Sequence, residues 1–278
     1  MGLRPFPPAT PPRAQRFPQI LGVLACLVAG CAGDTVDDAQ LPDRPAEELY
    51  SEGQSYLAEN NFRDAAKSFE EVERQHPYSQ WATRGQVMAA YSYYEANQYE
   101  EAIGAVERFI ELHPGNKDVP YAYYLMGMCY YEQISDVGRD QEMTQKALET
   151  FNELVRRFPQ SDYSRDAELK IDLVRDHLAG KEMEIGRYYQ RQQLWLAGIN
   201  RFRNVIEQYQ TTTHVPEALH RLTESYLALG MTQEAQASAA VLGYNFPGSE
   251  WYERAYALLQ GQNLEPARDE GSWFSRLL

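Results

Sequence analysis

Histidine, cysteine and carboxylate side chains are the residues of this 278-residue chain that could support catalysis or bind a metal. The five His are scattered, and no Cys or second paired His joins His214 and His220 at a zinc-binding spacing. The motifs HExxH, GxSxG and GxxxxGK followed by Ser or Thr are absent from the sequence. A glycosidase-like pair of carboxylates stays open, but solvated helix faces explain the many Glu and Asp better. The sequence therefore predicts a binding protein rather than an enzyme, with no metal site and no cofactor.

Cys31 is the side chain with the clearest chemical context. It follows a basic N-terminal region with three Arg residues and a short apolar run over residues 20–29. That run is too short to span a bilayer as a helix, and it fits the apolar region of a secretory signal peptide. The N-terminal segment is therefore expected to direct secretion.

The string from Val28 to Cys31 resembles the lipobox of bacterial lipoproteins. The resemblance implies a lipoprotein signal peptide over residues 1–30, with a diacylglyceryl group on the Cys31 thiol and an acyl chain on its amine. Several chains together anchor a protein stably to a membrane. Ala32 follows, where Asp would resemble an inner-membrane retention signal, so the outer membrane is expected. The alternative is an ordinary signal peptide followed by an incidental Cys.

Residues 31–45 are expected to contain the lipidated Cys and a flexible tether, because this segment is polar, rich in Asp and without a helical period. The whole chain has 26 basic and 40 acidic residues and a net charge of −14. This balance argues against nucleic-acid binding and against a polybasic lipid-binding surface. Cys129 is the one thiol left after Cys31, so we expect it to be a small buried hydrophobe rather than half of a disulfide.

One sequence pattern recurs along the rest of the chain. A Tyr precedes an Ala at the same distance in three places, and each copy ends in a Pro: Tyr56 with Ala65, Tyr93 with Ala102, and Tyr226 with Ala235. Repetition at about 34 residues is the signature of tetratricopeptide repeats, which are stacked pairs of helices. The predicted fold is all-α, a superhelical array of five tetratricopeptide repeats with a C-terminal capping helix. The expected segments are repeats at 46–78, 82–115, 120–160, 164–212 and 214–248, a cap at 250–260, and a tail at 261–278.

Two of the repeats depart from the regular pattern. The third separates Tyr130 from Ala147 by an insertion, which we expect in the turn between its helices, around residues 134–145. The fourth has Gln210 where the other copies have Pro. Residues 164–179 show helical spacing and should run into the first helix of the fourth repeat, with Gly180 as a candidate bend.

The first helix of each repeat should form most of the concave wall of the array. The stripe of residues expected to face this wall is rich in tyrosine in the first three repeats. Exposed aromatic residues in a concave surface usually mark binding, so we predict a groove for extended polypeptide. The candidate groove residues are Tyr50, Tyr91, Tyr94, Tyr121, Tyr124 and Tyr131. The alternative is that these tyrosines pack the interior of the superhelix or the seams between repeats. In the last two repeats the stripe carries Met183, Arg187, Gln190, Glu217, His220, Glu224 and Leu227.

The chain resembles the BamD (ComL) family of outer-membrane assembly lipoproteins. The resemblance rests on the lipobox, the acidic tether, the five repeats with an insertion in the third, and three strings: Arg108–Pro114, Tyr121–Gly127 and Trp195–Arg201. It implies a lipid-anchored scaffold on the periplasmic face of the outer membrane, which binds unfolded β-barrel proteins through its N-terminal repeats. It also implies docking of the C-terminal repeats on a periplasmic POTRA domain of BamA, beside other Bam lipoproteins.

Arg201 lies in the third of these strings and is the candidate contact with BamA; the alternative is an ion pair on the helix surface. Other periplasmic repeat lipoproteins remain rivals, namely a pilus-assembly pilotin or an adaptor for peptidoglycan hydrolases. A lytic enzyme using a buried Glu is the rival from the enzyme class.

Overall fold

The computed structural model describes residues 44–267, and all regular secondary structure within that range is α-helical. The helices are α1 (Ala46–Ala58), α2 (Phe62–Gln75), α3 (Gln80–Glu95), α4 (Tyr99–Leu112), α5 (Val119–Glu132), α6 (Glu142–Arg157), α7 (Asp162–Arg191), α8 (Trp195–Gln208), α9 (Val215–Ala228), α10 (Thr232–Asn245) and α11 (Glu250–Gln260). The predicted all-α array of helix pairs, ending in a capping helix, is confirmed. Residues 1–43, with the predicted signal peptide, Cys31 and most of the predicted tether, and residues 268–278 of the predicted tail lie outside the described residues. No helix within residues 44–267 has the length and apolar character needed to cross a membrane.

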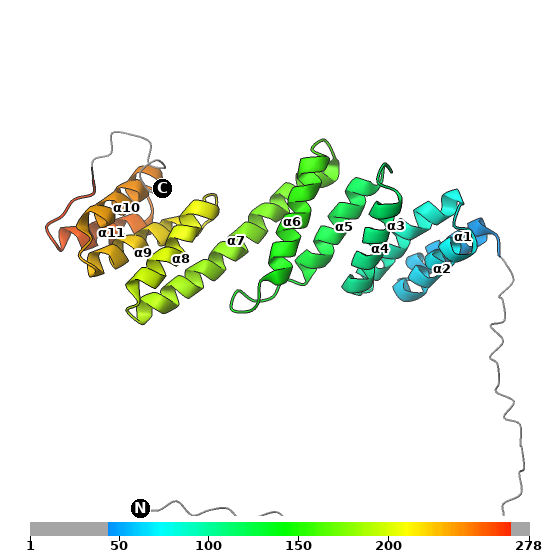
Figure 1. The fold of residues 1–278 in the computed structure, drawn as a ribbon, viewed down its shortest axis with the longest axis horizontal. Coiled ribbons are helices and arrows are strands. Elements are labelled where there is room, and N and C mark those ends of the chain that lie inside the picture. The colour runs from blue at the N-terminus through cyan, green and yellow to red at the C-terminus, as the bar shows by residue number, and fades with distance from the viewer. Residues whose placement is uncertain (1–43, 268–278) are drawn as a thin grey trace, which may run out of the picture. The chain divides into compact units, whose positions relative to one another are not determined.

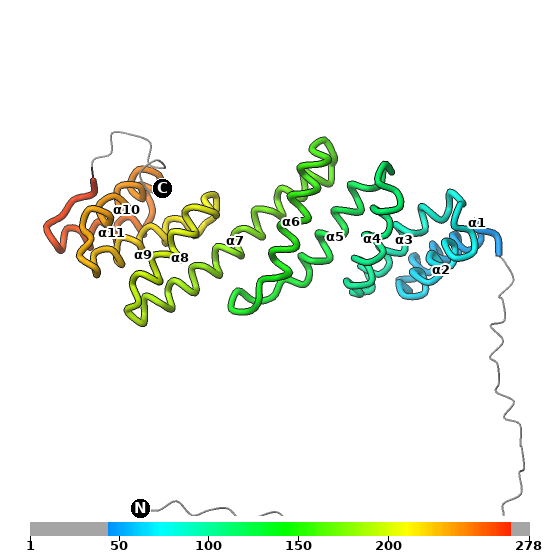
Figure 2. Tube along the Cα trace, in the orientation of Figure 1, coloured from blue at the N-terminus to red at the C-terminus, as the bar shows by residue number. Residues whose placement is uncertain are grey.

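Each helix packs against the next one along the chain, and the five pairs follow one another in order from α1 to α10 (Figure 1). The first helices of neighbouring pairs also contact each other, because α3 touches both α1 and α5, and α5 touches α7. The path of the chain through this arrangement is clear in the tube view (Figure 2). One face of the array is thus built from α1, α3, α5 and the N-terminal half of α7.

A left-handed residue closes the tight turn inside four of the five pairs. The φ values of these residues are 58° for Asn60, 56° for Asn97, 60° for Gln193 and 72° for Gly230. Asn and Gly tolerate this region, whereas it is uncommon for Gln. In each of these turns the carbonyl of the recurring Tyr accepts a backbone hydrogen bond, as in Asn61 N to Tyr56 O at 2.8 Å. The third pair has no such residue, because the insertion forms a longer loop over residues 133–141.

The core of three pairs consists of a phenylalanine packed against a glycine. Phe69, Phe151 and Phe202 are fully buried, and each ring lies where a side chain on the facing first helix would otherwise sit. The facing residues are Gly53, Gly127 and Gly186. In the second pair the corresponding residues are Ala90 and Val106, and in the fifth they are Thr223 and Ala239. The volumes on the two helices therefore compensate each other, as a close-packed interior requires.

Helix α7 has 30 residues and is about twice as long as its neighbours. It runs through Gly180 without interruption, so the candidate bend does not divide the helix. Gly180 instead permits a close approach, since a Cβ atom added there would lie 3.2 Å from His214 Nε2. The N-terminal half of α7 packs on α6 and its C-terminal half packs on α8.

Candidate polypeptide-binding site

Five tyrosines from three helices form a cluster that we call the aromatic face. Tyr91 and Tyr94 come from α3, Tyr121 and Tyr124 from α5, and Tyr163 from α7. The Tyr163 ring lies 5.2 Å from that of Tyr121 and 5.6 Å from that of Tyr124. Four of the side chains are partly exposed and Tyr163 is exposed. The contacts of α5 with α3 and α7 bring these residues together.

Carboxylates lie beside the aromatic face. The Tyr124 hydroxyl donates a hydrogen bond to Asp166 Oδ2 at 2.6 Å. Burial, with Glu95 contributing, raises the pKa of Tyr91. Burial, with Glu132 contributing, raises the pKa of Tyr94 to about 12. Burial is also the main cause of the raised pKa values of Tyr121 and Tyr124. The phenols are therefore neutral hydrogen-bond donors at physiological pH, with acidic groups beside them.

Two of the tyrosines predicted for the groove have other contacts. Tyr131 is partly exposed near the C-terminal end of α5, and the Lys170 ammonium lies 4.8 Å from its ring centroid. Tyr50 is buried, with its ring 5.2 Å from that of Phe69 and 4.9 Å from that of Trp81. Tyr50 is therefore part of the core of the first pair, and we do not include it in the aromatic face.

Tyr163 was not among the groove residues predicted from the sequence. The stripe predicted for the fourth repeat begins at Met183, so the N-terminal turns of α7 were left out. Tyr163, Asp166 and Lys170 nevertheless stand at helical spacing. That spacing was the signal that could have found them.

The corresponding stripe in the C-terminal pairs forms seams between helices. Met183 is fully buried, and Arg187 pairs with Glu217 at 3.1 Å. The Gln190 amide donates to Glu224 at 2.8 Å. His220 is also buried, and its ring lies 5.4 Å from that of Trp251 in the capping helix. Burial lowers its pKa, so the imidazole is neutral at physiological pH. The aromatic character of the N-terminal wall does not extend to these pairs.

Arg201 on α8 forms an ion pair within the chain. Its Nη1 lies 3.2 Å from Glu182 Oε2 on α7. The arginine side chain is 41% exposed and that of Glu182 is 16% exposed. The guanidinium therefore keeps donors facing solvent while one edge is held by the carboxylate.

Within residues 44–267, no three His, Cys, Asp or Glu side chains are arranged to hold a metal ion. The fold defines the class of this protein, a helical-repeat protein of the tetratricopeptide type, with an aromatic face on its N-terminal pairs.

Comparison with known proteins assigns the family. Residues 42–242 match the YfiO family, described as "Outer membrane lipoprotein". The chain is 52% identical over 246 residues to "Outer membrane protein assembly factor BamD" of Caulobacter vibrioides, covering 88% of this chain and 81% of the relative. It is 44% identical over 238 residues to the protein of the same name from Rickettsia prowazekii, covering 86% and 94%. The chain belongs to the BamD (YfiO) family of outer membrane lipoproteins.

Solved structures give more distant matches. The yeast Sti1 structure titled "TPR2AB-domain:pHSP90-complex" aligns with a TM-score of 0.41 and 16% identity, covering 76% of this chain and 80% of that chain.

Proposed function

We propose that this protein is a non-catalytic scaffold for outer-membrane protein assembly on the periplasmic face of the outer membrane. It binds unfolded β-barrel segments on the aromatic face and docks on a POTRA domain of BamA through its C-terminal pairs, beside other Bam lipoproteins. Acyl chains on Cys31 anchor it to the membrane. The family assignment supports this role over the pilotin and hydrolase-adaptor alternatives, because the relatives are named assembly factors.

The aromatic face is the observation that carries the substrate assignment. A strand of a membrane β-barrel alternates apolar and polar residues and is flanked by aromatic residues at the bilayer interfaces. Such a segment is extended before it folds, so one side of it can lie along partly exposed tyrosine rings. Each aromatic contact contributes roughly 1 kcal/mol beyond the area that it buries. At the edge of the face, tyrosine hydroxyls can donate hydrogen bonds to backbone carbonyls of the segment, and carboxylates can accept hydrogen bonds from its backbone N–H groups.

A double substitution tests this assignment. Tyr94→Ala with Tyr124→Ala should weaken binding of a peptide from the C-terminal strand of a barrel protein by about thirtyfold, because two ring contacts of roughly 1 kcal/mol each are lost. Fluorescence anisotropy measures the affinity, and circular dichroism verifies that helicity is unchanged. The matched control is Tyr78→Ala with Tyr244→Ala, since both side chains are highly exposed and lie outside the face. Unchanged affinity in the folded Tyr94 and Tyr124 variant would refute the substrate assignment.

The proposed docking on BamA depends on Arg201. The half-exposed guanidinium can take a second carboxylate while it stays paired with Glu182. Arg201→Glu would place two carboxylates together and repel an acidic partner surface, so recovery of the periplasmic region of BamA in a pull-down should fall strongly. Arg201→Lys is the control that keeps the charge. Equal recovery with Arg201→Glu would assign the residue a purely intramolecular role.

A further inference from the structure

The outer face of α10 differs from the outer faces of other second helices in the array. In a regular pair, the core Ala or Gly of the second helix is followed two, five and nine residues later by positions on the outer face. In the first and fourth pairs these positions are polar or charged: Lys67, Glu70, Arg74, Asn200, Arg203 and Glu207. In α10 the same positions carry Ala237, Ala240 and Tyr244, which together define what we call the α10 face.

The α10 face is open to solvent. The Tyr244 side chain is 79% exposed, and Ala237 and Ala240 are partly exposed. The sequence has no charged residue from Ala235 to Ser249. A surface helix normally carries polar side chains opposite its buried face, so an uncharged outer face indicates that a further segment covers it.

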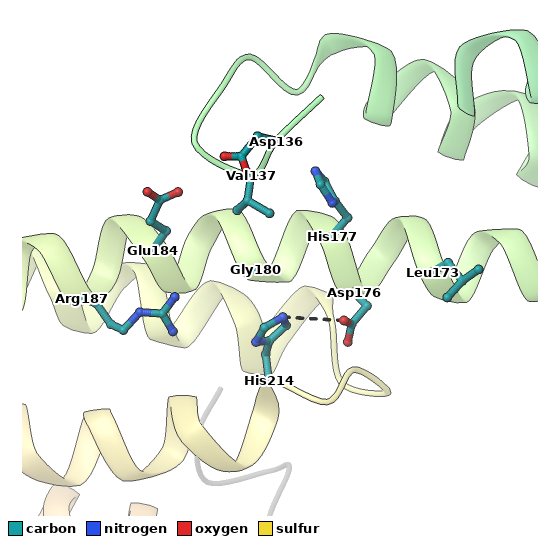
Figure 3. Close-up of a pocket in the computed structure, with 9 residues that line it drawn as sticks. All are labelled: Asp136, Val137, Leu173, Asp176, His177, Gly180, Glu184, Arg187 and His214. Atoms are coloured by element: carbon teal, nitrogen blue, oxygen red, sulfur yellow. Dashed lines mark ion pairs between the residues drawn. The ribbon is translucent and has the colours of Figure 1, made fainter. Parts of the chain in front are cut away.

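A hollow on α7 shows how a different open surface of the array is lined. It has a volume of about 480 Å³ and lies between the loop over residues 133–141, α7 and the turn before α9 (Figure 3). Within its lining, His214 lies 3.7 Å from Asp176, and Arg187 pairs with Glu217 at 3.1 Å. The α10 face lacks such charged groups, so apolar side chains can cover it without removing charges from water.

The described part of the chain ends on α10. After α11 the chain turns back, and Leu264 packs against the C-terminal core. The Gln236 side-chain amide donates to Glu265 O at 2.6 Å, and Ala267 N donates to Gln236 O at 3.2 Å. Gln236 directly precedes Ala237, so the chain arrives at the N-terminal end of the α10 face.

The residues that follow are rich in large apolar side chains. The tail over residues 268–278 contains Trp273, Phe274, Leu277 and Leu278. Its eleven residues span about 36 Å when extended at ~3.3 Å each, or about 16 Å as a helix at ~1.5 Å each. Gln236 and Tyr244 are eight residues apart in α10, which is about 12 Å. The tail is therefore long enough to cover the whole α10 face in either conformation.

We propose that the tail over residues 268–278 docks on the α10 face of its own chain. The rings of Trp273 and Phe274 cover Ala237 and Ala240 and pack beside Tyr244. Small side chains on the helix leave room for these rings, and each covered aromatic side chain buries roughly 150–250 Å². Because Ala267 is already held at one end of the face, the tail has a high effective concentration there, which favours it over a second copy. The inference does not depend on the proposed function.

Fluorescence quenching in the full acylated chain in detergent tests this docking. A bimane label is attached to the cysteine of Ala237→Cys, and the buried Cys129 does not compete for the reagent. Tryptophan quenches bimane on contact, so we expect the emission to be quenched and to recover in Trp273→Phe. Equal emission with and without Trp273 would overturn the inference.

Two variants of the same chain distinguish the α10 face from other surfaces. Ala240→Glu with Tyr244→Arg introduces the residue types that α2 carries at these positions, so the fold accommodates them, and the quenching should be lost. Quenching that persists in this variant would contradict docking on the α10 face. The matched control places the label at Gly104→Cys, the equivalent position of the second pair, where a Cβ atom meets nothing within 4 Å. Its emission should not respond to Trp273→Phe, and a response there would also overturn the inference.

Dilution identifies which chain supplies the tail. The labelled chain is mixed with an excess of the unlabelled Trp273→Phe chain. Quenching by the tail of the same chain should be unchanged. Recovery of the emission on mixing would make a second copy the occupant of the α10 face and would refute docking within one chain.

Discussion

Replacing Gly127 by Ala tests how the third helix pair positions the aromatic face. Gly127 lies on α5, the helix that carries Tyr121 and Tyr124. A Cβ atom at this position would lie 2.6 Å from Phe151 Cδ1 and 3.0 Å from Cζ, and closer still to Cε1. The Phe151 ring is fully buried, so it has no free space to enter. The substitution therefore forces α5 and α6 apart or pushes the ring off its rotamer.

Two opposing effects set the magnitude of the change. Ala stabilises a helix interior by about 1 kcal/mol relative to Gly. Overpacking a well-packed core costs roughly 1–3 kcal/mol, and a clash with three ring carbons belongs at the upper end of that range. We expect Gly127→Ala to lower the free energy of unfolding by about 2 kcal/mol. The core clash therefore outweighs the gain in helix propensity.

Gly104 provides the matched control. It also lies inside a helix, α4, but a Cβ atom there would meet nothing within 4 Å. Gly104→Ala should therefore raise the free energy of unfolding by about 0.5–1 kcal/mol. Urea unfolding followed by circular dichroism measures both changes. If Gly127→Ala stabilised the protein as Gly104→Ala does, the compensation of volumes between the paired helices would be refuted.

A second substitution should partly rescue the clash. The second pair naturally combines Ala90 with Val106 where the third has Gly127 with Phe151. Phe151→Val alone leaves a cavity and should destabilise by roughly 2–3 kcal/mol. Combined with Gly127→Ala, the loss should be smaller than the sum of the single losses by about 1–2 kcal/mol. Simple additivity would mean that the two side chains do not compete for the same space.

Three further predictions concern single residues. Folding raises the pKa of Tyr94 from about 10 to about 12, so between these pH values the folded state keeps a proton that the unfolded state loses. The midpoint of urea unfolding should therefore fall as the pH rises from 10 to 12. The fall should be smaller in Tyr94→Phe, which has no phenol to titrate at this position. Burial raises the pKa of the Cys129 thiol to about 12, so a disulfide reagent should label it only after unfolding, and rapid labelling of the folded protein would contradict its burial. Cys31→Ser should leave unprocessed precursor or a non-acylated product. If mass spectrometry found no acyl chain on the N-terminus of the mature wild-type protein, the lipid anchor would be refuted.

The sequence was most informative where local chemistry repeats. The Tyr–Ala pair, of which Tyr56 and Ala65 are the first copy, recurs at a fixed spacing because the same tight turn joins the two helices of every regular pair. The array could therefore be predicted from this pattern alone. The insertion in the third repeat is visible for the same reason. The compensation between Gly127 and Phe151 could not be predicted from one sequence, because it depends on the distance between two helices.

The candidate site was predicted less completely. Tyr50 and Tyr94 stand on the same expected stripe, but Trp81 and Phe69 enclose Tyr50 in the first pair. That enclosure depends on how three helices meet, which periodicity along one helix does not specify. Tyr163 was missed because the predicted stripe of the fourth repeat begins at Met183, whereas α7 begins at Asp162.

The uninterrupted helix α7 relates the proposed substrate and partner surfaces to each other. Tyr163 and Asp166 join the aromatic face from its N-terminal end, while Glu182 holds Arg201 near the other end. Tyr163 and Glu182 are 19 residues apart in this helix, which is about 29 Å at 1.5 Å per residue. A polypeptide on the aromatic face and a partner at Arg201 would therefore both contact the same continuous helix.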